Sequence, residues 1–320
     1  MRTVLVGLLG VLGLAIQLVA AADLVPGITN SSAAAAPGAN DPVEQEFKKL
    51  MADDDAAQAD VDQWIRDNEA AVSRGAAVPK ADLERRIRER FKPVREAYND
   101  FLARHPDHAR ARLAYGSFLG DFHDDAGARE QWEKALALNP KDPAAYNNLA
   151  NLYSQTGPLN KAFEYYGKAI ELNPRQPLYY RNLGDVVYLY RTNAMTYYGL
   201  GEQQVYDKVL ELYRKALSFD PTDFPLASDV AQIYYGIKPL RIEEALRSWT
   251  NTLALAHDEI ERQGVYLHFA RLKLQANRFA EVRAHLNAVT NAMYNVLKQR
   301  LTRSLEEQEG QAKGTNAPAR

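Results

Sequence analysis

Apolar residues recur along most of this chain at the spacing of amphipathic helices, and the pattern itself repeats with a period of about 34 residues. In successive copies Gly116, Ala150 and Gly184 stand in register, and Ala128 stands in register with Ala162. A repeat of this length predicts helical hairpins that stack into a solenoid, because each hairpin can bury its apolar face only against its neighbours. No alternation of apolar and polar residues is long enough to predict a strand.

The copy over residues 143–176 shows the pattern most completely. Its small residues let two helices approach closely, its aromatic residues fill the space between hairpins, and Gly157-Pro158 separates the two helices. The positions that carry the pattern are Tyr146, Leu149, Ala150, Tyr153, Gly157, Ala162, Tyr166, Ala169 and Pro174. They resemble the tetratricopeptide repeat (TPR) family. The resemblance implies an all-α, right-handed superhelical solenoid of antiparallel helix hairpins with helical caps at both ends.

The repeat register also predicts how the chain is divided. Four repeats are expected over 109–142, 143–176, 177–223 and 224–257, and the third holds an insertion of roughly 13 residues. An N-terminal helical cap is expected over 42–108, and a degenerate repeat with a C-terminal cap helix over 258–308, followed by a disordered tail over 309–320. In the caps and the insertion the pattern favours helices over 42–52, 55–74, 80–104, 177–191 and 279–307.

The N-terminus has the features of an export signal. Arg2 precedes an apolar run from Val4 to Ala22, and small residues at Ala20 and Ala22 have the spacing of a cleavage site. Residues 1–22 are therefore predicted to be a signal peptide, with a flexible linker over 23–41, which indicates a periplasmic or extracellular protein. The run is also just long enough to span a bilayer, so an uncleaved inner-membrane anchor stays open as the alternative.

Composition narrows the function classes further. The chain has 39 basic and 41 acidic residues among 320, a net charge of −2, which predicts no nucleic-acid partner. It has no cysteine, which excludes disulfides and thiol catalysis. No phosphate loop, nucleophile elbow or paired-histidine zinc motif occurs, and His105, His108 and His123 are too far apart to share a metal ion. We therefore expect no enzyme activity, no metal and no cofactor.

The candidate site is a peptide-binding groove. In the TPR family the first helix of each hairpin lines the concave face, so the resemblance implies that residues around its Leu-Gly pair reach a bound peptide. Asn148 and Asn182 stand at equivalent positions, as in the asparagine ladder of O-linked N-acetylglucosamine transferases, and an amide can both donate to and accept from a peptide backbone. Equally, these residues could only solvate an exposed helix face. The groove residues predicted in this way are Asn147, Asn148, Asn151, Arg181, Asn182, Asp185 and Tyr188.

The insertion in the third repeat is rich in tyrosine. Tyr188, Tyr190, Tyr197 and Tyr198 precede or lie within it, and Gly199-Leu200-Gly201 follows. Such residues either contact a partner or pack against their own hairpin. The whole pattern predicts an exported TPR scaffold that binds an unidentified protein or peptide segment in its groove. The alternative is an envelope assembly factor held at the membrane by its uncleaved N-terminal helix.

Overall fold

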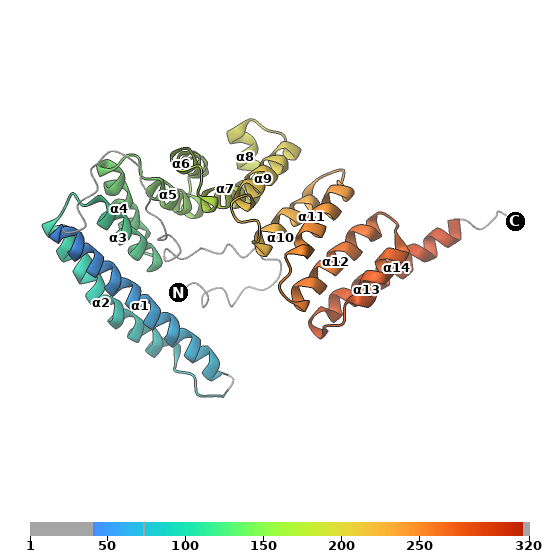
Figure 1. Cartoon of the computed structure of the whole chain (residues 1–320), viewed down its shortest axis with the longest axis horizontal. Helices are drawn as coiled ribbons and strands as arrows, with labels where there is room; N and C mark the ends of the chain where they lie inside the picture. Colours follow the sequence, from blue (N-terminus) through green and yellow to red (C-terminus); the bar gives the residue numbers. More distant parts are fainter. Residues whose placement is uncertain (1–40, 73, 316–320) are drawn as a thin grey trace. The chain divides into compact units, whose positions relative to one another are not determined.

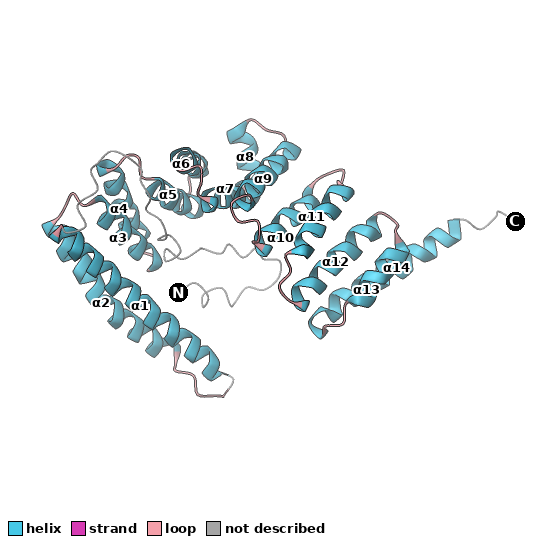
Figure 2. Ribbon diagram, in the orientation of Figure 1, coloured by secondary structure: helices cyan, strands magenta, loops and turns pink. Residues whose placement is uncertain are grey.

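A computed structural model of the chain describes residues 41–72 and 74–315. The predicted signal peptide and nearly all of the predicted linker lie outside these residues. Every regular element in the described ranges is helical, as the all-α prediction requires (Figure 2). None of the described helices is both long enough and apolar enough to cross a membrane.

The helices follow one another along the chain with short connections (Figure 1). The chain divides into two compact units, Met1–Leu152 and Tyr153–Arg320, so the boundary falls inside α5. In chain order, the helices up to the third predicted repeat are α1 (Pro42–Val72), α2 (Lys80–Arg104), α3 (Ala109–Asp121), α4 (Asp125–Leu138), α5 (Pro143–Thr156), α6 (Leu159–Leu172) and α7 (Pro177–Leu189). The others are α8 (Arg191–Tyr198), α9 (Glu202–Leu217), α10 (Phe224–Ile233), η2 (Tyr234–Gly236), α11 (Ile242–Ala254), α12 (Glu259–Gln275), α13 (Phe279–Ala288), η3 (Ala292–Tyr294) and α14 (Asn295–Thr315).

The first unit begins with a long hairpin of α1 and α2. The sequence predicts two helices over 42–52 and 55–74, and this is wrong, because α1 is one helix of 31 residues. At the predicted break Asp54 is buried, 3% exposed, and its carboxylate accepts a hydrogen bond from Tyr98 Oη on α2 at 2.7 Å. Burial raises the pKa of Asp54, and this hydrogen bond opposes the change. Because the Asp54 carboxylate has a hydrogen-bond partner on the facing helix, α1 can continue through this position.

Paired helices approach closely where a glycine faces an aromatic ring. In the hairpin of α3 and α4, a Cβ atom built on Gly116 would lie 2.5 Å from Trp132 Nε1. In the hairpin of α7 and α9, a Cβ atom on Gly184 would overlap the ring of Tyr213. Both contacts join positions that the repeat pattern aligns, so the close approach predicted from small residues is confirmed at these two hairpins.

The second unit continues the hairpin series with α7 and α9, α10 and α11, and α12 and α13 (Figure 1). The sequence predicts one helix over 177–191, but α7 ends at Leu189 and the insertion forms a separate short helix, α8, which contacts α6. Gly199 ends α8 in the left-handed conformation, with φ of 66°, as a helix-ending glycine commonly does.

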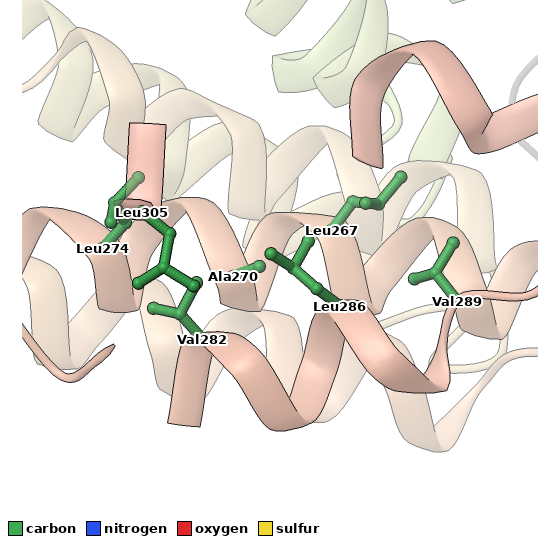
Figure 3. Close-up of a cluster of buried hydrophobic side chains, with 7 residues drawn as sticks. All are labelled: Leu267, Ala270, Leu274, Val282, Leu286, Val289 and Leu305. Atoms are coloured by element: carbon green, nitrogen blue, oxygen red, sulfur yellow. The ribbon is translucent and has the colours of Figure 1, made fainter. Parts of the chain in front are cut away.

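The C-terminal end departs from the predicted single helix over 279–307. The chain turns after α13 because the side-chain oxygen of the buried Gln263 accepts hydrogen bonds from the backbone N–H groups of Thr290 and Asn291, both at 2.8 Å. The chain then forms α14, which contributes Leu305 to a hydrophobic core shared with α12 and α13 (Figure 3). That core consists of Leu267, Ala270, Leu274, Val282, Leu286, Val289 and Leu305.

The disordered tail predicted from residue 309 begins too early, because α14 stays helical to Thr315. Glu309 lies inside this extension and accepts hydrogen bonds from Arg283 Nη2 of α13 at 2.8 and 2.7 Å through its two oxygens. Such a contact to the neighbouring helix stabilises the last turns, which sequence pattern alone did not indicate.

The glycine–aromatic contact predicts opposite effects of one substitution at two helical glycines. Gly184→Ala should destabilise the fold by about 1–3 kcal/mol, because the added methyl group overlaps Tyr213. Gly167→Ala in α6 should instead stabilise it by up to about 1 kcal/mol, because nothing lies within 4 Å of its Cβ position and alanine favours a helix. Urea denaturation followed by circular dichroism measures both. Equal effects of the two substitutions would contradict the packing described here.

Candidate functional site

The predicted groove residues of the first unit lie on α5 and differ in accessibility. Asn147 is 2% exposed and cannot be part of an accessible peptide surface. The helical spacing explains this correction, since Asn147 stands one turn before Ala150 and shares its buried side. Asn148 is half-buried and donates from Nδ2 to Ser117 Oγ of α3 at 3.2 Å. Asn151 is also half-buried.

The predicted residues of the second unit, Arg181, Asn182, Asp185 and Tyr188, all lie on α7 and are half-buried. All four therefore stand within about two turns of one helix.

A mixed-charge cluster forms where α7 meets α10. Arg181 lies between two aspartates, with Nη1 at 3.6 Å from Asp223 Oδ2 and Nη2 at 3.5 Å from Asp229 Oδ2. Asp185, one turn further along α7, accepts a hydrogen bond from Tyr213 Oη at 2.6 Å. Asp223 also caps α10 by accepting from the backbone N–H of Leu226 at 2.8 Å. One guanidinium thus stands among three carboxylates, and we call these four charged residues (Arg181, Asp185, Asp223 and Asp229) the aspartate cluster.

The electrostatics of this cluster follow from its partial burial. Burial raises the pKa of the Asp229 carboxyl to about 6; the Arg181 guanidinium opposes this rise, and the charges of Asp185 and Asp223 add to it. Burial also raises the pKa of Asp185, against the hydrogen bond from Tyr213 and the charge of Arg181. The cluster therefore holds more carboxylate than its one guanidinium can neutralise, and a further hydrogen-bond donor or cation would lower its energy.

The repeat register gives α10 and α12 positions equivalent to Asn182 of α7. Asn182, Asp229 and His268 each stand two residues before a small residue of their helix, namely Gly184, Ala231 and Ala270. Sequence reasoning named only the first of these three as a site residue. Asp229 and His268 could have been found by taking the position two residues before the small residue, Ala231 or Ala270, in the later and less regular copies.

The equivalent position on α12, His268, has aromatic and basic surroundings. His268 stacks on Trp249 of α11, with ring centroids 3.8 Å apart, and its Nδ1 lies 3.0 Å from Tyr235 Oη of η2. Burial, aided by the charge of Arg271, lowers the pKa of His268 to about 4, so its ring is neutral at physiological pH. Arg271 is exposed and places its guanidinium 4.3 Å from the centre of the Tyr235 ring. Sequence reasoning missed Tyr235, His268 and Arg271.

The tyrosines of the insertion pack mainly within the second unit. The rings of Tyr197 and Tyr198 lie 5.2 and 5.5 Å from that of Phe163 on α6. Tyr188 lies 6.4 Å from Tyr206 of α9, and Arg191 stands over both of these rings. Tyr197 keeps 41% of its surface exposed. Tyr188 thus packs within its own hairpin, whereas Tyr197 and Tyr198 pack against α6 of the preceding repeat.

Across residues 41–72 and 74–315, no group of three or more histidine, aspartate or glutamate side chains is placed to hold a metal ion.

The raised pKa of Asp229 predicts a pH dependence of stability. A folded-state pKa of about 6, above the value near 3.9 of an unfolded aspartate, means that the folded state holds the proton more tightly. This tighter proton binding adds up to about 2–3 kcal/mol to the free energy of unfolding below about pH 4. The contribution is lost as the pH rises through 6. Asp229→Asn should therefore flatten the fall in stability between pH 4 and 7. Urea denaturation at several pH values tests this, with the exposed Glu133→Gln as control. An unchanged pH profile in Asp229→Asn would contradict it.

Comparison with known proteins places these observations in a family. The sequence matches the family description "TPR repeat" over residues 124–157 and "Tetratricopeptide repeat" over residues 143–176. Among curated proteins, no match to this sequence was found.

Several solved structures resemble the chain. YrrB, described as a TPR protein with an unusual peptide-binding site, is 13% identical with a TM-score of 0.51, and the match covers 65% of this chain and 99% of YrrB. The C-terminal part of a TPR repeat-containing protein from Cytophaga hutchinsonii is 12% identical with a TM-score of 0.53, covering 78% and 97%. MamA is 21% identical with a TM-score of 0.42, covering 61% and 91%.

The matches to the repeat descriptions fall on the copies in which the sequence pattern is most regular. The first two solved structures share the arrangement of helical hairpins found here. This chain is a tetratricopeptide repeat protein, with an all-α TPR solenoid fold.

Proposed function

We propose that this protein is an exported interaction scaffold that holds an extended peptide segment on the face formed by α7, α10 and α12. A role in protein–protein contacts follows from its TPR repeats. The single observation that supports this particular face is the aspartate cluster, which is half-buried, rich in carboxylate and placed on the first helices of two successive hairpins.

The chemistry of this face favours a peptide of a certain kind. Asp229 and Asp185 can accept hydrogen bonds from backbone N–H groups or pair with a lysine or arginine side chain. Asn182 can both donate to and accept from a peptide backbone. Arg271, at the α12 end, can pair with an acidic side chain or a terminal carboxylate. We therefore expect a ligand segment that carries a basic residue near α7 and α10 and a negative group near α12.

In the first unit, Asn148 and Asn151 offer similar amide chemistry on α5, and they stay proposed binding residues of that unit. Asn148 already donates to Ser117, which uses one of its two N–H groups and leaves its oxygen available for a peptide N–H group. Asn147 is not part of the proposal because it is buried.

The proposed export rests on the sequence of residues 1–22 alone. A cleaved signal would release the scaffold into the periplasm or the exterior, whereas an uncleaved apolar helix would make it a membrane-anchored envelope assembly factor. The peptide-binding face is the same in both cases, so the two proposals differ in where the partner would be met.

The peptide proposal predicts a charge preference that can be measured directly. Peptides selected from a random library by the purified protein should be enriched in lysine and arginine. Asp229→Asn and Arg271→Ala should each weaken binding about tenfold in fluorescence anisotropy, because each removes one charged contact worth about 1.4 kcal/mol. The exposed Glu211→Gln on α9 keeps the fold and serves as control. If both substitutions leave the affinity of the selected peptides unchanged, the face formed by α7, α10 and α12 is not their binding site.

The export proposal predicts the mass of the mature protein. Expressed in a bacterial host with its native N-terminus, the chain should lose residues 1–21 or 1–22, and intact-mass measurement should show this in the periplasmic fraction. A full-length mass in the membrane fraction would instead support the anchored assembly factor. A full-length mass in the cytoplasmic fraction would contradict both.

A further inference from the structure

The last helix of the second unit carries an apolar surface that its own core does not use. A solenoid normally ends in a unit with a polar outer face, because an apolar end would attract other chains. In α14, Leu305 is buried against α12 and α13, as expected of a closing helix. The first turn of α14 breaks the pattern, since Val296 and Leu297 are 77% and 51% exposed.

Two neighbouring segments enlarge this surface. Met293 of η3 is 63% exposed, and Ile260 in the first turn of α12 is 43% exposed. The two segments are held together by Tyr294, whose Oη donates to the backbone oxygen of Ile260 at 2.9 Å. We call Ile260, Met293, Val296 and Leu297 the terminal patch. It lies apart in the fold from the peptide face proposed above, because Tyr294 holds it at the N-terminal end of α12.

The terminal patch has charges of opposite sign on its two sides. Val296, Arg300 and Arg303 follow one another on a single stripe of α14, at the spacing of successive turns and on the side opposite Leu305. The first turn of α12 carries Glu259 and Glu261, both near the patch. This acidic side lies close to Tyr294 of the neighbouring segment. Burial raises the pKa of Tyr294, and the charges of Asp258 and Glu261 raise it further.

This distribution is self-complementary. When two copies meet face to face about a two-fold axis perpendicular to the line from the acidic to the basic side, the acidic side of each copy meets the basic side of its partner. A membrane surface would instead favour one sign of charge around the apolar residues. We propose that the terminal patch is a homodimer interface, in which two copies of this chain pack their α14 helices antiparallel, with Arg300 and Arg303 of each copy facing the acidic first turn of α12 in the other.

The test is the oligomeric state of the full chain by sedimentation equilibrium. The wild-type protein should be a dimer at about 50 μM. Val296→Asp should raise the dissociation constant at least about tenfold, because the buried charge enters the interface twice. Val72→Asp, at a position 63% exposed in α1, is the matched control and should leave the dimer intact.

A charge-swap pair tests the orientation and also excludes loss of folding. Arg300→Glu and Glu259→Arg should each weaken the dimer alone, because each sets like charges against each other. Mixed in equal amounts, they should form a heterodimer of near wild-type affinity, since both contacts again join opposite charges. A monomeric wild type at about 200 μM, a dimer indifferent to Val296→Asp, or a mixture that fails to associate would each overturn the proposal. So would binding of a monomer to anionic vesicles that Val296→Asp abolishes.

Discussion

The close contact between a glycine on one helix and an aromatic ring on its partner sets the geometry of two hairpins, α3 with α4 and α7 with α9. Gly116 against Trp132 and Gly184 against Tyr213 bring the two helices nearer than any larger residue would allow. The contact in the second unit also fixes the position of Tyr213, whose hydroxyl donates to Asp185 in the aspartate cluster. A steric requirement of packing thus places a polar group of the proposed binding face.

Two buried polar side chains, Asp54 and Gln263, obtain hydrogen bonds from elements distant in sequence. Asp54 is satisfied by Tyr98, and Gln263 by the backbone of residues 290 and 291. The first contact joins α1 to α2, and the second joins α12 to the turn that follows α13, so each holds one element against another. The aspartate cluster differs, because Asp229 is partly buried yet faces more carboxylates than cations. An incompletely neutralised, half-buried group is costly for stability, and a ligand that neutralises it would recover that cost.

The second unit therefore carries two surfaces of different character. The face of α7, α10 and α12 is polar and half-buried, which suits an extended peptide held by hydrogen bonds and ion pairs. The terminal patch is apolar and exposed, which suits burial against a rigid surface of matching shape. A scaffold built in this way could join two copies of itself while leaving the peptide face of each copy accessible.

The 34-residue pattern was enough to predict the all-α TPR solenoid, the hairpins and the small residues at their contacts, because these depend on local spacing that recurs in every copy. It also indicated the helix that carries Arg181 and Asp185. It could not indicate that Asn147 is buried, that α1 runs unbroken through Asp54, or that the chain turns between α13 and α14. Nor could it pair Arg181 with Asp229, 48 residues away in sequence. These features depend on partners supplied by other helices, and such contacts exist only once the hairpins have packed.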